Sequence, residues 1–306
     1  MNTRIYCPDI ECESCIRLLT KTFENNLKIN NFTINKEYID IAHEDSFEPK
    51  DIISLINEKG FRAGFDPFLR KTFSERFRDF IQNKSKYETE YKIIKYWLAG
   101  FGLLLMIELI FFYVFLKDIP GFLSKYAIWL FYLDLVVVSI SSAVLHIRSY
   151  KVNIKDMAGM MIGMTFGMQT GMMIGTIIGY TNGLFMGCIV GMLTGVFIGV
   201  LNGKCCGIMG IMEGMMAGIM GGVMGGMTGV MFLVDKANWF MPPFMILNLI
   251  VIFSLSYMMF EEVIEGNLKI IKNNINFLTY FLYIFIIITI LSLIMIYGIK
   301  TGVASL

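Results

Sequence analysis

Two closely spaced cysteine pairs are the groups in this sequence best suited to binding a soft metal ion. Cys12 and Cys15 have two residues between them, which lets both sulfur atoms converge on one cation. They stand just before an expected helix, whose free N–H groups favour the thiolate form. A disulfide or a redox pair would use the same spacing. The adjacent Cys205 and Cys206 are expected to be free thiols, with fatty acylation or a merely interfacial position as the alternatives.

Methionine is a second source of soft ligands, and it is concentrated in one stretch. Residues 157–231 hold 17 of the 24 methionines, in two rows at helical spacing. Thioether sulfur selects Cu(I) and scarcely binds Zn(II), and a ladder of weak sites would pass an ion along without trapping it. Methionine is also a flexible apolar filler, which explains any single one of them. Besides the two cysteine pairs, the expected metal ligands are Met161, Met164 and Met168 in the first row and Met209, Met212, Met216 and Met220 in the second.

Three carboxyl groups stand out because they occur inside apolar segments. Glu108 and Asp134 each lie about eight residues from the outer end of their segment, so antiparallel neighbours would hold them at one level. A shared proton or a bound cation would offset the cost of burying them, and neutral hydrogen-bonded side chains are the alternative. Glu213 could join Met209 and Met212 in an entry site beside the second cysteine pair. Cys188 is a weaker candidate ligand.

The first 66 residues must position Cys12 and Cys15, and their periodicity predicts a small α+β domain. Strands are expected at 3–7, 31–35, 37–42 and 61–65, and helices at 14–25 and 49–59. This β-α-β-β-α-β order is the split βαβ, or ferredoxin-like, arrangement. Cys7 alternates with the core positions of the first strand and is expected to be buried.

Residues 3–66 resemble the heavy-metal-associated domain shared by copper chaperones and metal-pumping P-type ATPases. Ile10-Glu11-Cys12-Glu13-Ser14-Cys15 matches the metal loop of that family, and Glu58-Lys59-Gly60-Phe61 matches the loop that flanks the metal. The resemblance implies metal binding by Cys12 and Cys15, and packing of Ile10, in place of the usual Met, beneath the loop. Glu11 is similar to zinc- and cadmium-type members, where a carboxylate adds a hard ligand, or it is a solvated charge. Cu(I) is the preferred cation, with Zn(II) or Cd(II) as alternatives.

The rest of the chain has the composition of a membrane domain. Residues 1–95 carry 32 of the 51 charged residues, and the following 211 positions carry only 19. Apolar runs of about 20 residues are long enough to cross a bilayer as helices. We therefore expect a domain at 1–68, an amphipathic linker helix or solvated connector at 69–93, and an all-α transmembrane bundle at 94–306. About seven spans are expected, at 94–116, 126–147, 157–179, 183–201, 207–233, 241–260 and 278–299.

The charges beside these spans predict an orientation in the cell membrane. Lys and Arg number 14 in the flanks on the side of the N-terminal domain and 4 on the other side. The positive-inside rule then places the N-terminal domain in the cytoplasm and the C-terminus outside, with no signal peptide expected before the domain. The reducing cytosol would keep Cys12 and Cys15 as thiols.

Glycine recurs at every fourth position from 159 to 207, and again from 210 to 226. Such a stripe lets a second helix backbone approach closely. It predicts that the third, fourth and fifth spans pack tightly against each other or against copies in a homo-oligomer.

These features favour a membrane protein of heavy-metal transport or homeostasis, whose cytosolic domain loads Cu(I) or another soft metal. A copper chaperone or a metal-receiving protein would be its partner. The alternative is a membrane-tethered metallochaperone or assembly factor, whose glycine-rich helices only oligomerise or dock a partner. A P-type pump is excluded, since D-K-T-G-T, an intramembrane C-P-C and a phosphate-binding loop are all missing from the sequence.

Two further classes of protein are not expected from this sequence. The histidines, His43 and His146, are far apart in the chain, and nothing resembles a nucleophile with its base, so we do not expect an enzyme. The net charge of +1 makes no electrostatic case for a nucleic-acid partner, because phosphate binding needs a clustered basic surface.

Overall fold

The structure is a computed structural model of the whole chain, which divides into two units, residues 1–83 and 84–306. The residues that it describes are 2–7, 10, 13–24, 26, 29–35, 38–43, 49–58, 61, 63–66, 78, 82, 87–116, 122–151, 156–232, 237–260, 271–272 and 276–300. The amphipathic helix expected at 69–93 falls mostly outside these residues. Its last part belongs instead to the first membrane helix, which begins at Glu88.

The N-terminal unit is a small mixed α/β fold with a three-stranded antiparallel sheet in the order β1-β3-β2. On the edge of β1 that does not pair with β3, Tyr6 and Gly64 exchange two backbone hydrogen bonds of 2.8 and 3.0 Å. In the described part of 61–66 this bridge is all that forms of the expected closing strand, so that prediction was too long. The bounds are β1 Asn2–Tyr6, α1 Glu13–Glu24, β2 Ile29–Ile34, β3 Tyr38–His43 and α2 Pro49–Glu58.

One face of this sheet packs against the two helices. Residues of β3 alternate between half-buried and buried, so that Ile39 and Ile41 enter a core with Leu19 of α1 and Ile52 of α2. This alternation is the period-2 pattern of a half-buried strand. Cys7 is fully buried, as predicted, and belongs to the same core.

The expected metal loop is described only at its edges. Ile10 is 2% exposed and packs in the core, which agrees with its expected place beneath the loop. Glu11 and Cys12 lie outside the described residues. Of Cys15 the structure describes only the backbone, in the first turn of α1. Metal binding by Cys12 and Cys15 therefore stays a prediction.

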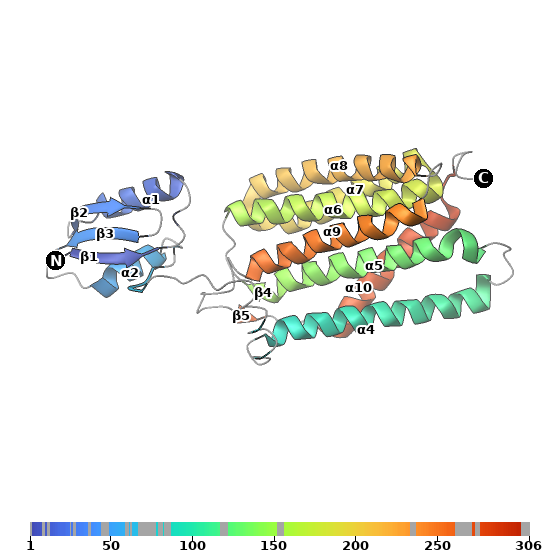
Figure 1. Cartoon of the computed structure of the whole chain (residues 1–306), viewed down its shortest axis with the longest axis horizontal. Coiled ribbons are helices and arrows are strands. Elements are labelled where there is room, and N and C mark those ends of the chain that lie inside the picture. Colours follow the sequence, from blue (N-terminus) through green and yellow to red (C-terminus); the bar gives the residue numbers. More distant parts are fainter. Residues whose placement is uncertain are drawn as a thin grey trace. The chain divides into compact units, whose positions relative to one another are not determined.

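The second unit is a bundle of long apolar helices (Figure 1). A short π-helix, Phe112–Leu116, extends the first of them, and the two-residue strands β4, Tyr150–Lys151, and β5, Ile271–Lys272, pair with each other. The helices are α4 Glu88–Phe111, α5 Phe122–Ser149, α6 Asp156–Asn182, α7 Leu184–Gly203, α8 Gly207–Met231, α9 Ala237–Met259 and α10 Phe277–Tyr297.

Six segments of the described chain are long and apolar enough to cross a membrane. One of them, Leu184–Met231, is 48 residues long and contains both α7 and α8, joined by the three-residue turn η2, Lys204–Cys206. At 1.5 Å per residue a single helix of that length would be about 72 Å long, more than twice the hydrocarbon thickness. The seven spans that we expected correspond to the six segments with this one counted as two antiparallel helices.

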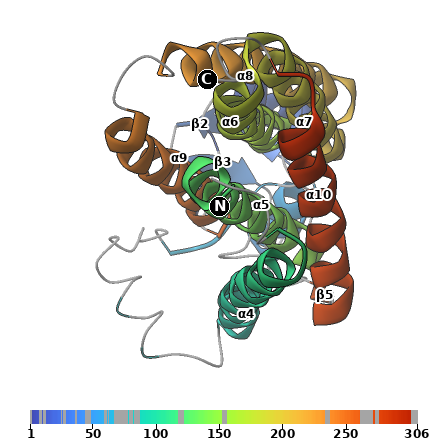
Figure 2. The same cartoon turned by 90° about the vertical axis from the view of Figure 1, so that its right-hand side faces the viewer.

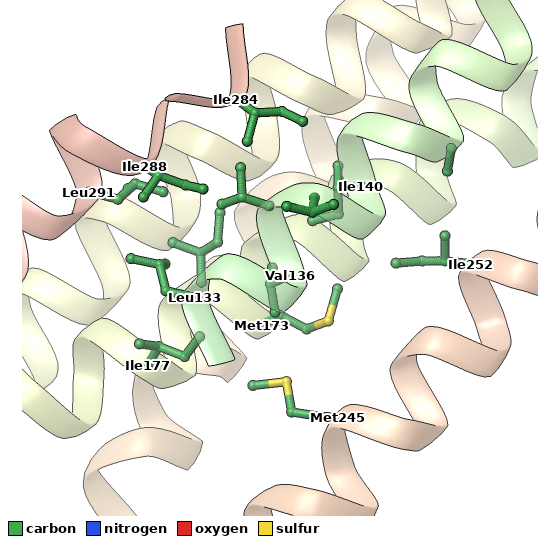
Figure 3. Packing of buried hydrophobic residues seen from close by; sticks show 14 of the residues in the cluster. Leu133, Val136, Ile140, Met173, Ile177, Met245, Ile252, Ile284, Ile288 and Leu291 are labelled. Atoms are coloured by element: carbon green, nitrogen blue, oxygen red, sulfur yellow. The ribbon is translucent and has the colours of Figure 1, made fainter. Parts of the chain in front are cut away.

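Helix α5 lies at the centre of the bundle and packs against α4, α6, α9 and α10 (Figure 2). Leu133, Val136 and Ile140 of α5 face buried side chains from three of these neighbours (Figure 3). Large apolar side chains fill this interface. The facing residues are Met173 and Ile177 of α6, Met245 and Ile252 of α9, and Ile284, Ile288 and Leu291 of α10.

Candidate functional site

Helices α6, α7 and α8 contact each other through their glycines. A methyl group built at Gly222 of α8 would lie 2.1 Å from the backbone nitrogen of Met192 in α7. One built at Gly167 of α6 would lie 2.5 Å from the carbonyl oxygen of Gly214 in α8. These distances are too short for any side chain, so the backbones themselves are in contact. The close packing of the third, fourth and fifth spans that the glycine spacing predicted is therefore present within one chain.

Each of the three helices contacts the other two in a fixed register. Gly179 of α6 lies against Gly187 of α7, and Gly167 lies against Gly199, so these two helices run antiparallel. The glycines of α6 also meet those of α8 in increasing order along both helices, which makes that pair parallel. The glycine stripe therefore lies in the contacts among α6, α7 and α8 of one chain.

The methionines of α8 form a row on the face opposite the glycines. At 100° per residue, Met220 is turned by about 200° from Gly218, which places the two on opposite sides of the helix. Every member of this methionine row is exposed in the chain, by 45% to 75%. The row consists of Met209, Met212, Met216, Met220, Met224, Met227 and Met231.

The first predicted row, on α6, is exposed at only one end. Met161 and Met164 are exposed, whereas Met168 is partly buried. The reason is a second set of glycines on α8, because a methyl group at Gly221 would lie 2.4 Å from the carbonyl oxygen of Met168. The two rows therefore do not enclose an interior path within one chain.

Two thiols that form no disulfide lie at the start of the methionine row. Cys205 and Cys206 form the end of η2, and their sulfur atoms are 3.6 Å apart. Two sulfurs that bind one tetrahedral ion at about 2.3 Å would be about 3.8 Å apart, so the observed separation suits the binding of one metal ion by both thiols. The Cys205 thiol donates a hydrogen bond to the carbonyl oxygen of Asn202 at 3.2 Å. Both sulfurs lie against Gly159 of α6, where any side chain would collide with them.

The remaining predicted ligands of α7 and α8 lie at different depths. Glu213 is half-buried on α8, four residues beyond Met209. Cys188 lies inside the α7–α8 hairpin, where its thiol donates to the carbonyl oxygen of Val223 at 3.8 Å, far along the helix from the other thiols. Among the described residues no three His, Cys, Asp or Glu side chains are placed to share one ion. The further soft donors near the two thiols at this end of α8 are the thioethers of Met209 and Met212.

Glu108 and Asp134 are brought together across the contact between α4 and α5. Asp134 is fully buried, and neither of its carboxylate oxygens has a hydrogen-bond donor. Glu108 is half-buried, and its carboxyl group is close enough to interact with that of Asp134. Two ionised carboxylates are acceptors only, so a hydrogen bond between them requires a proton.

A second ionisable cluster, which we did not predict, lies near the opposite end of the same two helices. The hydroxyl of Tyr150 donates to Glu90 Oε1 at 2.5 Å, and His146 Nε2 is 3.9 Å from that oxygen. His146 and Tyr150 are both 7% exposed, and burial, with the hydrogen bond to Glu90, raises the pKa of the Tyr150 hydroxyl. The four-residue spacing of His146 and Tyr150 is the sequence signal that could have indicated this cluster. Glu90, however, falls in the expected linker at 69–93.

Comparison with protein-family models, with curated proteins and with solved structures gave no match for this chain. The resemblance to heavy-metal-associated domains therefore depends on the loop residues and the order of elements alone. The structure supports a polytopic membrane protein with about six candidate spans and a small N-terminal α/β unit.

Proposed function

We propose that this polytopic membrane protein handles a soft metal ion, with Cu(I) as the preferred cation, in metal transport or homeostasis. One observation carries the proposal: two thiols 3.6 Å apart stand at the start of an uninterrupted, exposed methionine row. Thiolate and thioether sulfur together are the donor set that favours Cu(I) over the harder divalent ions.

The end of α8 would act as the entry site. Cys205 and Cys206 would hold the ion first, and Met209 and Met212, within two turns of the thiols, would share it. Met216 and Met220 continue the row, and Met161, Met164 and Met168 offer further thioethers on α6. Because thioethers bind weakly and equivalently, an ion could exchange between neighbours without being trapped.

The N-terminal unit would supply the ion. Its resemblance to heavy-metal-associated domains favours Cys12 and Cys15 as the loading pair. The excess of Lys and Arg in the flanks on its side favours a cytoplasmic position for this unit, with the C-terminus outside. An acidic ligand from Glu11 would shift the preference toward Zn(II) or Cd(II). A copper chaperone or a metal-receiving protein would then be the exchange partner, and copies of the chain could associate as a homo-oligomer.

Binding of Ag(I), a stable substitute for Cu(I), tests the proposed donor set. The full-length protein is equilibrated with Ag(I) in detergent, and bound metal is counted by mass spectrometry after gel filtration. We expect the double variant Cys205→Ser/Cys206→Ser to lose Ag(I) relative to the wild type and Cys12→Ser/Cys15→Ser to lose a separate portion. Met209→Leu/Met212→Leu should weaken Ag(I) binding at the entry site on α8, where the two thiols are still present.

A matched control uses methionines that are buried elsewhere in the bundle. Met241 and Met245 of α9 are each 1% exposed. Met241→Leu/Met245→Leu therefore removes two thioethers, as the test variant does, but leaves the methionine row of α8 intact. Its Ag(I) content should equal that of the wild type. Equal Ag(I) content in the wild type and in both cysteine double variants would overturn the soft-metal proposal, and a preference for Zn(II) would remove the thioethers from it.

A membrane-tethered metallochaperone or assembly factor is the second candidate. The exposure of the methionine row favours it, because a path open along one side of a single chain does not by itself isolate an ion from lipid. Flux of Ag(I) into proteoliposomes separates the two candidates. Uptake that depends on Met216 and Met220 supports transport, whereas binding without uptake supports the tethered chaperone.

A further inference from the structure

The buried acidic and basic side chains of the membrane unit all lie on one helix–helix contact. Among the described residues of this unit, one acidic side chain, Asp134, and one basic side chain, His146, are less than a tenth exposed. Both are on α5. Each is opposed by a glutamate from α4, Asp134 by Glu108 and His146 by Glu90. We call this contact the α4–α5 seam. Burying ionisable groups within a membrane is costly, so their alignment on one seam calls for a function.

The deeper station of the seam is the pair Glu108–Asp134. Asp134 is 0% exposed and its two oxygens meet no donor, although a buried carboxylate normally accepts several hydrogen bonds. Glu108 brings a second acceptor against it. One proton held between the two carboxyl groups supplies the missing donor and removes one negative charge from the apolar interior.

The second station, Glu90–His146–Tyr150, lies where α4 begins and α5 ends. The Tyr150 hydroxyl donates a hydrogen bond to Glu90 Oε1. No hydrogen-bond partner is present for Glu90 Oε2 or for either ring nitrogen of His146. His146 Nε2 is 3.9 Å from Glu90 Oε1, just beyond direct bonding distance. A neutral imidazole accepts a proton at one ring nitrogen and donates one from the other, so His146 can relay a proton beside Glu90.

Polar groups of the seam lie between the two stations. His146 is twelve residues from Asp134 along α5, which is about 18 Å of helix. Within that interval the indole N–H of Trp97 donates to Ser139 Oγ at 3.1 Å, and Ser142 Oγ donates to the carbonyl oxygen of Ser139. Trp97 and Ser139 thus place a donor and an acceptor across the α4–α5 contact, and Ser142 adds a hydroxyl group one turn further along α5.

The other titratable groups around the seam are engaged or face away. From α10, the Tyr280 hydroxyl donates to the carbonyl oxygen of Val138 at 3.5 Å. Glu88 and Lys92 of α4 pair with each other on the exposed face, and Arg148 of α5 is exposed. Helix α9 carries no acidic or basic residue, and α6 carries only Asp156, at its first position.

We propose that the α4–α5 seam is a proton path through the membrane unit, with Glu90–His146–Tyr150 as one proton-exchange station and Glu108–Asp134 as the other. A proton passes from His146 through the polar groups of the seam to the carboxyl pair, which holds one proton at rest. No bond other than those to the proton forms or breaks. This function goes beyond metal handling, and it needs no metal.

Infrared spectroscopy tests the deeper station directly. The difference spectrum between the wild type and Glu108→Gln/Asp134→Asn at pH 7 should contain one carbonyl stretch of a protonated carboxylic acid and one carboxylate band. Both substitutions preserve shape, and thermal unfolding checks that the variant is folded. Two carboxylate bands without a protonated acid would overturn the proposal for this pair.

Proton flux tests the path as a whole. The metal-free protein is reconstituted in vesicles with an internal pH dye, and a potassium diffusion potential drives protons inward. We expect the wild type to acidify the vesicles faster than protein-free vesicles do, and Asp134→Asn, Glu90→Gln and His146→Gln to lose that excess. Glu88→Gln is the matched control, because its exposed side chain pairs outside the seam, and it should conduct as the wild type does.

Two outcomes of the flux measurement would overturn the path. One is a wild-type rate equal to that of protein-free vesicles. The other is undiminished flux in folded Asp134→Asn and Glu90→Gln. Because metal is absent throughout, neither outcome bears on the soft-metal proposal, and failure of Ag(I) binding would leave the path untouched.

Discussion

The membrane unit packs its helices in two different ways. Helices α6, α7 and α8 meet through glycine backbones, whereas α5 meets α4, α9 and α10 through large side chains such as Leu133 and Ile288. Where backbones touch, no interior space remains for a side chain, so the long methionines of α8 point outward. Where side chains separate the helices, carboxyl, imidazole and hydroxyl groups can lie between them.

The difference divides the chemistry of the unit between its two parts. The glycine-packed part offers sulfur ligands on its surface, where a soft ion or a partner can reach them. The part packed by large side chains encloses ionisable groups, on which the proposed proton path depends. Substitutions in the glycine-packed part should therefore destabilise the protein by collision, and those in the other part by leaving a cavity or removing a hydrogen bond.

The largest loss of stability is expected for Gly222→Ala in α8. Its methyl group would lie 2.1 Å from the backbone nitrogen of Met192, and backbone atoms cannot move aside as a flexible side chain does. We expect the free energy of unfolding to fall by about 3 kcal/mol or more. Denaturant titration in micelles measures it. Gly102→Ala is the control, because a methyl group there meets nothing within 4 Å and should stabilise α4 slightly.

A smaller loss is expected for Leu133→Ala in α5. Leu133 is fully buried among branched side chains, so its removal leaves a cavity instead of a collision. We expect the free energy of unfolding to fall by about 2 kcal/mol. The separated helices remain in lipid, which is as apolar as the protein interior, so the substitution removes only the packing contribution of the side chain. The same titration checks this value. An effect larger than that of Gly222→Ala would contradict the proposed contrast between the two kinds of packing.

A single interhelical hydrogen bond should contribute less still. Ser139→Ala removes the acceptor of the Trp97 indole N–H, which donates at 3.1 Å across the α4–α5 seam. Such bonds in membrane bundles average about 0.6 kcal/mol. The free energy of unfolding should fall by about that amount, and the fluorescence of Trp97 should shift to shorter wavelength because its indole N–H loses its hydrogen-bond acceptor. Ser142→Ala, which removes only a bond within α5, should leave Trp97 unchanged.

The smallest effect on stability is expected on the methionine row. Met220 is 57% exposed on the face of α8 that no helix of the chain covers. Met220→Leu keeps the volume and the apolar character, so the free energy of unfolding should change by less than about 0.5 kcal/mol. A clear loss of stability would show that the row is buried by a second copy, and a concentration-dependent unfolding midpoint would accompany it.

Local patterns in the sequence were sufficient for most of the elements. Strand alternation around Ile39 and Ile41, and the order of strands and helices, predicted the N-terminal sheet and its buried face. The fourth strand is shorter than predicted, because an edge strand is held by a single neighbour. Among the described residues of 61–66, only Gly64 pairs with Tyr6. Apolar length predicted the membrane helices, and the glycine spacing predicted which of them approach closely.

The candidate sites were less predictable, because ligand type and spacing say nothing about the neighbour that a side chain meets. The spacing of Glu108 and Asp134 suggested that they share a level, and the structure places them together. Glu90 escaped notice because it looked like part of a linker. Its partners, His146 and Tyr150, come from a different helix and a two-residue strand.

The sequence by itself determined that this chain has a small α/β unit and an apolar helical unit, and that one side of α6, α7 and α8 carries only glycine. Helical periodicity is a local property, so spacing alone assigns residues to one face of a helix. Only the tertiary structure decided that the methionine row faces outward and that α4 sets one glutamate against Asp134 and another against His146 of α5. Those facts depend on contacts between residues far apart in the chain, which no local spacing encodes.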